Sequence, residues 1–210
     1  MNVEASSKVQ TIAMTQAANK LTFDQYLNLD AEDWLRLGLP EGRCEFVDGE
    51  IVELPVEDRI NAKIALFLLT RLLSVFPEDR LCCKDTEIAV RSNKARTRVP
   101  DLMLLSKALA AVLGDGRSTV TLDMPPPDLI VEVVSPGSTN ENRDYQLKRA
   151  EYAARCVPEY WAIDPEENKI TVFTLTNGQY TETVYTGEMV IQSQIEVLRL
   201  TAEQVLKRRR

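Results

Sequence analysis

Two carboxylates interrupt otherwise apolar segments of this sequence. Asp101 directly precedes the run LMLL, and Glu132 lies between two valines in DLIVEVV, residues 128–134. An ionised carboxylate within a buried strand is costly unless a cation or hydrogen bonds compensate its charge. If the two strands are neighbours, opposing side chains lie about 5 Å apart at Cβ and can share a hard cation such as Mg²⁺. The alternative is that each acid lies at a strand end and faces solvent or an arginine.

A lysine follows the second acid on a segment with helical spacing. Lys148 lies four residues after Asp144 and beside an apolar stripe of Leu147, Ala150 and Ala154. We therefore expect it near the buried edge of a helix. In one role it forms an ion pair with Asp144 at i,i+4 spacing, and periodicity alone favours this role. In the other role it orients an attacking water and offsets the charge that builds on a phosphate.

Some kinds of chemistry are excluded by the residue types that are absent. The chain contains no histidine, which excludes Ser-His-Asp and Cys-His catalysis and histidine zinc sites. Hydrolysis therefore depends on carboxylates, lysine and a hard metal ion. The four cysteines include no CxxC pair, as is typical of reduced thiols, and we expect a cytoplasmic protein. No apolar run approaches the ~20 residues that cross a membrane.

The charge distribution bears on nucleic-acid binding. A net charge of −7 argues against a large surface that coats nucleic acid, but it is compatible with a local basic groove. Five basic residues surround one predicted connection between strands, where they either contact phosphates or form a solvated turn. These nucleic-acid-binding candidates are Lys84, Arg91, Lys94, Arg96 and Arg98.

The remaining pattern predicts the elements that must position these residues. Asp48-Gly49 between alternating runs predicts a hairpin over residues 44–54. Helical spacing predicts a short helix within 22–37, a buried helix over 57–76, and a third from residue 139 or 140 to about Arg155. Further strands are predicted at 81–90, 98–105, 128–134, 159–164, 169–175 and 180–185, the last two forming a hairpin.

These elements predict one α/β domain, with a mixed central sheet flanked by helices and with N-terminal and C-terminal β-hairpins. A chain of 210 residues is long enough for one well-buried core. We assign residues 1–20 to a flexible arm, residues 21–206 to the domain and residues 207–210 to a basic tail.

Several motifs of the chain occur together in one known family. They are Pro100-Asp101, DLIVEVVSPGS at 128–138, the helix residues Asp144, Lys148 and Tyr152, and VPEYWAIDP at 157–165. In this combination the chain resembles the Uma family of restriction endonucleases, part of the PD-(D/E)XK superfamily, from about Thr22 to Leu206. The resemblance implies a restriction-endonuclease-like fold and metal-dependent cleavage of phosphodiester bonds in nucleic acid, with DNA as the expected substrate.

The resemblance also implies roles for individual residues. Asp101, Glu132 and Lys148 would be catalytic, and the two acids with the backbone carbonyl of Val133 would hold Mg²⁺, for which Mn²⁺ can substitute. Glu45 matches an acidic position of the family and is a further candidate metal ligand. The alternative for Glu45 is a strand carboxylate that pairs with Arg43 or a nearby lysine.

The chain departs from the superfamily pattern in two places. Val134 occupies the lysine position two residues after Glu132, and Lys148 on the following helix is its natural replacement. The family also often has a histidine near the start of the first core helix, where this chain has Asp58 and Asn61. The role of that histidine is therefore unassigned here.

Two alternatives and an oligomeric state stay open at this point. Val134 motivates a catalytically silent, nuclease-like scaffold that binds DNA or a protein partner without cutting. In a third reading the acids serve only as ion pairs of a small-ligand or protein-interaction module. A homodimer is compatible with the exposed edges of the two hairpins, and a double-strand cutter benefits from two sites.

Overall fold

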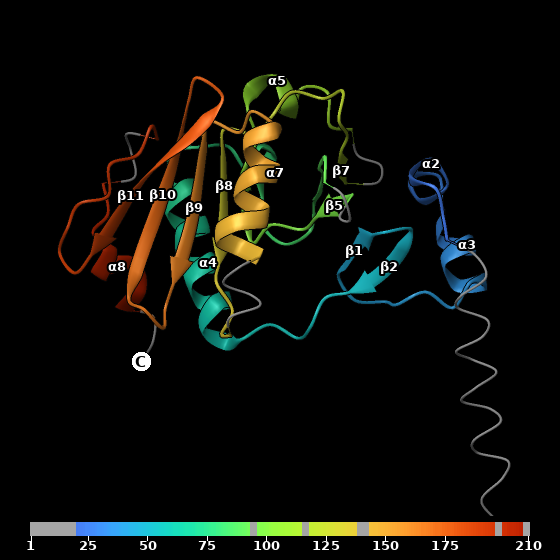
Figure 1. Ribbon diagram of the computed structural model, residues 1–210, viewed down its shortest axis with the longest axis horizontal. Helices are drawn as coiled ribbons and strands as arrows, with labels where there is room; N and C mark the ends of the chain where they lie inside the picture. Colours follow the sequence, from blue (N-terminus) through green and yellow to red (C-terminus); the bar gives the residue numbers. More distant parts are fainter. Residues whose placement is uncertain (1–19, 93–95, 115–117, 138–142, 196–198, 208–210) are drawn as a thin grey trace, which may run out of the picture.

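The computed structural model describes residues 20–92, 96–114, 118–137, 143–195 and 199–207 (Figure 1). The predicted arm, apart from Lys20, and the last residues of the predicted tail lie outside this range, as does Lys94. Among the described helices, none is long and apolar enough to cross a membrane.

A six-stranded mixed sheet forms the centre of the molecule, in the spatial order β11-β10-β9-β8-β6-β3. β8 and β9 are parallel, and the other neighbouring pairs are antiparallel. The predicted α/β class with a mixed sheet is therefore confirmed. The strands are β3 (Leu81–Cys82), β6 (Leu102–Leu104), β8 (Leu129–Val133), β9 (Glu159–Asp164), β10 (Lys169–Thr176) and β11 (Gln179–Thr186).

Helices cover both faces of this sheet, with α4 (Arg59–Leu73) behind it and α7 (Lys148–Ala154) in front (Figure 1). Alternate residues of β8 pack against α4, whereas Ile130 packs in the same cluster as Tyr152 of α7. Glu132 lies two residues after Ile130 and therefore projects from the same face of the strand. The pleat of β8 thus directs the buried acid toward α7.

Shorter elements lie beside the sheet. β1 (Cys44–Val47) and β2 (Glu50–Glu53) form the predicted hairpin, and the φ angles of 50° at Asp48 and 83° at Gly49 suit a type I′ turn. A three-stranded sheet has the order β5-β4-β7, formed by Thr97–Arg98, Glu87–Ala89 and Thr119–Val120. The other helical segments are α2 (Phe23–Leu27), α3 (Ala31–Arg36), η1 (Glu78–Arg80), α5 (Lys107–Ala110), the π-helical η2 (Arg143–Leu147) and α8 (Ala202–Leu206).

Two predicted single strands are wrong, because the backbone turns inside each of them. Residues 81–90 form β3 and β4, which belong to different sheets. Between them Lys84 has φ of 65°, and Asp85 accepts a hydrogen bond from the Cys83 N–H, a side-chain turn that ends the pairing. Residues 98–105 divide into β5 and β6 around Pro100, which has no N–H to extend a ladder.

The predicted helices also differ from the structure at their ends. The stretch 22–37 forms two helices because Asp30 accepts a hydrogen bond from the Asp33 N–H and caps α3 as a new helix. The predicted helix 57–76 is present as α4, with Asp58 as its N-cap. The C-terminal hairpin is confirmed, with β10 and β11 joined at Asn177-Gly178.

Candidate active site

The pairing of β6 with β8 brings the two predicted acids together. The strands are antiparallel neighbours, and the register that joins Leu102 to Val131 places Asp101 opposite Glu132. Both carboxylates are buried, with 8% of Asp101 and 3% of Glu132 exposed. The neighbouring strands expected from the sequence are therefore present, and neither acid faces open solvent.

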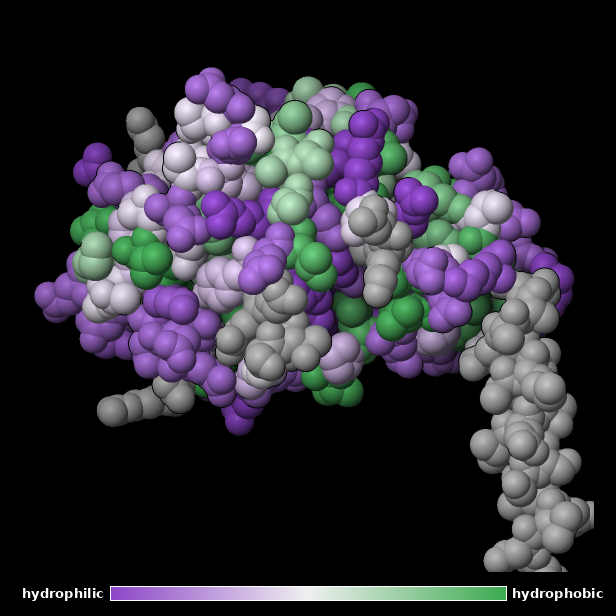
Figure 2. Space-filling view, in the orientation of Figure 1, coloured by the Kyte–Doolittle hydropathy of each residue, from purple (hydrophilic) through white to green (hydrophobic). Residues whose placement is uncertain are grey.

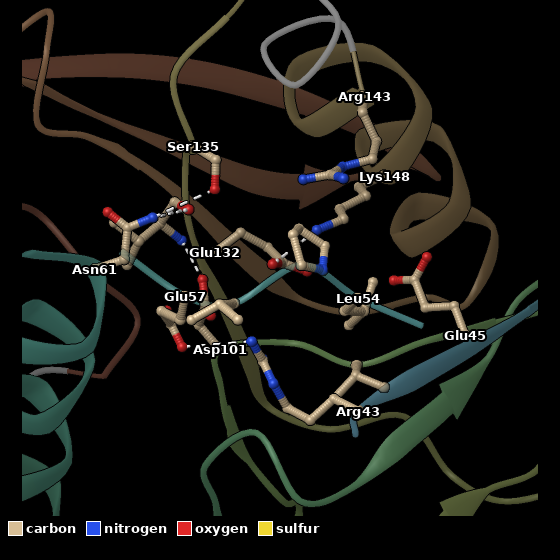
Figure 3. Close-up of a pocket in the computed structure, with 14 residues that line it drawn as sticks. Arg43, Glu45, Leu54, Glu57, Asn61, Asp101, Glu132, Ser135, Arg143 and Lys148 are labelled. Atoms are coloured by element: carbon tan, nitrogen blue, oxygen red, sulfur yellow. Dashed lines mark hydrogen bonds and ion pairs between the residues drawn. The ribbon is translucent and has the colours of Figure 1, made fainter. Parts of the chain in front are cut away.

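A cavity of ≈ 90 Å³ lies beside these acids (Figure 3). All three predicted catalytic residues, Asp101, Glu132 and Lys148, line it together with Val133. Glu45 lines it as well. The fold thus gathers on one pocket the residues that the sequence distributes over β1, the start of β6, β8 and α7.

Asp101 is fixed by two interactions with different elements. Its Oδ2 accepts a hydrogen bond from the Val133 N–H at 2.6 Å. Its Oδ1 lies 3.2 Å from the Nζ of Lys84. The first contact ties the carboxylate to the backbone of β8, so the carboxylate has a single oxygen directed away from that strand.

Glu132 is held from α7 by two side chains. Its Oε1 accepts a hydrogen bond from the Tyr152 hydroxyl at 2.6 Å, and its Oε2 lies 2.8 Å from the Nζ of Lys148. Burial raises the pKa of Glu132 to about 7, because desolvation and the charges of Asp101 and Asp144 together outweigh the opposing effect of Lys148. Burial also raises the pKa of Tyr152 well above its usual range. The phenol therefore stays protonated and acts as the hydrogen-bond donor to Glu132.

Lys148 forms the ion pair with Asp144 that was one of its two expected roles, and it also pairs with Glu132. Its Nζ lies 2.8 Å from Glu132 and 3.0 Å from Asp144 at i,i+4 spacing. Burial lowers its pKa, but the two carboxylates reverse the effect and raise the pKa above its ordinary value, so the ammonium is charged at neutral pH. The lysine stands at the first residue of α7, directly after the π-helical turn of η2, a feature frequent at functional sites.

Glu45 has a different partner from the one considered in the sequence. Its Oε2 lies 2.8 Å from Nη1 of Arg98, whereas Arg43 contacts Glu57. The same guanidinium makes two hydrogen bonds to Glu151 of α7, at 2.7 and 2.9 Å. Arg98 therefore joins β1, β5 and α7 inside the protein.

The predicted phosphate contacts do not form one surface. Arg98 is buried with both of its carboxylate partners. Lys84 is half-buried against Asp101 and Glu57. Arg91 and Arg96 are exposed, and Lys94 lies outside the described residues. Only these two exposed arginines remain candidates for contacts outside the pocket in the described part of the cluster.

The structure adds residues that the sequence interpretation missed. Arg43 and Arg143 line the cavity and supply positive charge at its edge. The sequence interpretation included Tyr152 in a motif but gave it no role. Its i,i+4 spacing from Lys148 was an available signal, because this spacing places both side chains on one face of a helix. Glu57 carried no such signal, because an acid just before a helix is ordinarily read as a favourable dipole contact.

The two departures from the superfamily pattern have structural counterparts. The side chain of Val134 is buried in the core cluster that contains Tyr152, and Lys148 supplies an ammonium to Glu132 from the neighbouring helix. Asn61 of α4 is buried, and its amide donates to the Val133 carbonyl at 3.4 Å. Asn61 therefore holds the carbonyl that the resemblance implies as a metal ligand.

The donor set is suited to a hydrated hard cation. Among the described residues, no group of three or more His, Cys, Asp or Glu side chains is arranged to hold a metal ion, so an all-protein cage is absent from that part of the chain. Mg²⁺ needs only one or two carboxylates, because it retains waters and binds substrate phosphate. Asp101 and Glu132 with one backbone carbonyl satisfy that requirement.

The chain is similar to known proteins in sequence and in fold. The profile of the family Uma2, described as "Putative restriction endonuclease", matches residues 23–203. The fold is similar to that of a putative nuclease belonging to DUF820 from Anabaena variabilis, known from a crystal structure. The TM-score is 0.65 with 16% sequence identity, and the match covers 90% of this chain and 98% of the other. No curated protein matches the chain.

Proposed function

Because the chain belongs to the Uma2 family, which is described as "Putative restriction endonuclease", we propose that it hydrolyses phosphodiester bonds of nucleic acid, with DNA as the expected substrate. The observation that carries this proposal is the convergence of Asp101, Glu132 and Lys148 on one cavity. Two buried carboxylates beside a buried ammonium are costly to desolvate. Such an arrangement at a pocket, with the pKa of Glu132 displaced, is typical of a functional site.

The residues that would hold Mg²⁺ or Mn²⁺ are Asp101, Glu132 and the carbonyl of Val133. When bound, the metal lowers the pKa of a water molecule and stabilises charge on the phosphate. The chain itself keeps the two carboxylates in place. The backbone N–H of Val133 fixes Asp101, and the Tyr152 hydroxyl fixes Glu132, so neither carboxylate has to be ordered when substrate arrives.

In this proposal Lys148 orients the nucleophile. Its ammonium lies between Glu132 and Asp144 and lines the cavity. A charged ammonium there can donate to a water and offset charge on a phosphate oxygen. Arg43 and Arg143 line the same cavity, and their guanidinium groups are suited to phosphates on either side of the cleaved bond.

The direct test is metal-dependent cleavage of supercoiled plasmid and of single-stranded DNA at low salt. We expect cutting with Mg²⁺ or Mn²⁺ that is lost in Glu132→Ala and retained in Glu188→Ala, which removes an exposed carboxylate. Equal cutting by the parent and Glu132→Ala contradicts the assignment of this pocket as the active site. Equal cutting with and without metal contradicts the metal requirement.

One observation favours a second function, a silent scaffold that binds DNA without cutting. Both acids already have a lysine at ion-pair distance, Lys84 for Asp101 and Lys148 for Glu132, so each has a positively charged partner without metal. This alternative predicts DNA binding that does not change with Mg²⁺ and no cleavage of any substrate. A gel-shift titration with and without metal separates the two functions.

We also propose that a double-strand cutter of this kind acts as a homodimer, which places two sites on one duplex. The face seen in Figure 2 carries scattered hydrophobic residues within a mostly hydrophilic surface, so it does not indicate where a second copy binds. Sedimentation equilibrium with and without a DNA duplex measures the oligomeric state. A monomer under both conditions contradicts the dimer.

A further inference from the structure

Lys84, one of the predicted phosphate contacts, has its side chain directed toward the carboxylates of Glu57 and Asp101. Its side chain is 15% exposed, and its Nζ contacts Glu57 and lies 3.2 Å from Oδ1 of Asp101. The Nζ atom is buried and, among the described residues, makes these ion pairs without a hydrogen bond of good geometry. The ammonium of Lys84 is therefore held by electrostatic attraction to the two carboxylates, as a bound metal cation would be.

The contact with Asp101 uses the oxygen that the backbone of β8 leaves available. Oδ2 of Asp101 already accepts the Val133 N–H at 2.6 Å, which leaves Oδ1 as the oxygen directed away from β8. Lys84 lies at that oxygen. A divalent cation bound to this oxygen would lie close to the ammonium of Lys84, and the repulsion between the two positive charges opposes binding of both.

Glu57 is the second carboxylate in contact with this ammonium. One of its oxygens contacts Lys84, and the other lies 3.5 Å from Arg43. Glu57 lines the same cavity as Asp101 and lies beside it (Figure 3). The backbone of Lys84 itself has a φ of 65°. This conformation is uncommon for residues other than glycine and persists only where surrounding contacts fix it.

We propose that Glu57 and Asp101 form a cation subsite that the ammonium of Lys84 fills in the metal-free chain. A divalent cation then binds at Asp101 only by displacing Lys84. This inference rests on the proposed metal-dependent function and adds Glu57 as a ligand and Lys84 as an internal competitor. Lys148 is different, because its two carboxylates lie on the α7 side, at Glu132 and Asp144.

Calorimetric titration of the full chain with Mn²⁺ tests the competition without measuring cleavage. Lys84→Met keeps the length of the side chain and removes its charge. We expect its Mn²⁺ dissociation constant to fall at least about tenfold. The reason is that the repulsion between two charges at contact distance is larger than the free energy that corresponds to a tenfold change in affinity. The control Lys107→Met removes an exposed lysine outside the cavity and should bind Mn²⁺ as the parent does.

Two further variants test the proposal. Asp101→Asn should abolish binding, and Glu57→Gln in the Lys84→Met background should weaken it. Unchanged or weaker affinity in Lys84→Met overturns the inference, and if the parent still binds Mn²⁺ through Asp101, the proposed function stands. Absence of Mn²⁺ binding in every variant overturns the inference and the metal-dependent function together.

A measurement on the unmodified sequence covers the case in which Lys84→Met does not fold. In NMR spectra with labelled lysine side chains, addition of Mg²⁺ should shift the signal of Lys84, identified by its absence in Lys84→Arg. A Lys84 signal that stays constant while Mg²⁺ binds at Asp101 overturns the displacement.

Discussion

The hydroxyl of Tyr152 provides a sharp test of how the site is held, because it can be removed without a change of shape. It donates to Oε1 of Glu132 at 2.6 Å, inside the protein. Tyr152→Phe leaves the ring in the core and one carboxylate oxygen without its donor. A hydrogen bond to a charged group contributes about 1.5–3 kcal/mol, and we expect a stability loss of about 2 kcal/mol.

The same substitution should reduce cleavage more than a purely structural change does. Loss of a group that orients a ligand typically costs about 10–100-fold in activity or metal affinity. We would measure urea denaturation and Mg²⁺-dependent cleavage at pH 8, where Glu132, with its pKa of about 7, is ionised. The result that refutes the reasoning is full activity in Tyr152→Phe, with or without a loss of stability.

The matched control for this prediction is Tyr180→Phe. The Tyr180 hydroxyl donates to the Val157 carbonyl at 2.7 Å and is also buried, but Tyr180 does not line the cavity. Its removal should cost about 1 kcal/mol, the value of a neutral hydrogen bond, and should leave cleavage unchanged. Equal losses of activity in both variants would mean that the assay reports stability alone.

Three other predictions concern the buried charges. Arg98→Met leaves two buried carboxylates without their partner and should lower the free energy of unfolding, measured by urea denaturation, by about 3–5 kcal/mol. The control Arg96→Met, at an exposed position, should lower it by less than about 0.5 kcal/mol. Similar losses in the two variants contradict a structural role for Arg98. The pKa of Glu132 is raised from 4.5 to about 7, so the stability contributed by its protonated form is complete below pH 4.5 and lost as the pH rises through 7. Glu132→Gln should therefore gain stability relative to the parent between pH 5 and pH 8, and a constant difference refutes this. Val134→Lys should not restore cleavage to Lys148→Met and should lower the melting temperature, because residue 134 faces the core; restored cleavage would show that the usual lysine position is still functional.

Local sequence patterns were sufficient for the strands that carry Glu132 and Glu45. The apolar run around Glu132 predicted the central strand β8, and the turn at Asp48-Gly49 predicted the first hairpin, because strand burial and turn geometry depend on neighbouring residues. The pairing of β6 with β8, which sets Asp101 opposite Glu132, followed once the two strands were assumed to be neighbours. The sequence alone could not supply that assumption.

Strand boundaries were less predictable, because apolar patterning does not mark where the backbone turns. Residues 81–90 look like one strand, yet Lys84 adopts a left-handed conformation and the halves join different sheets. That turn directs Lys84 to Asp101. From the sequence, Lys84 was expected either in a solvated turn or in contact with phosphate. Neither expectation describes its observed ion pair with Asp101.

The composition of the chain by itself determined which side chains are available for chemistry: carboxylates and lysines, without histidine. The tertiary structure alone decided which charges meet. It pairs Glu132 with Lys148, encloses Arg98 between Glu45 and Glu151, and places Lys84 against Asp101. The physical reason is that periodicity fixes the face on which a side chain lies, whereas its partner is set by the packing of elements distant in the sequence.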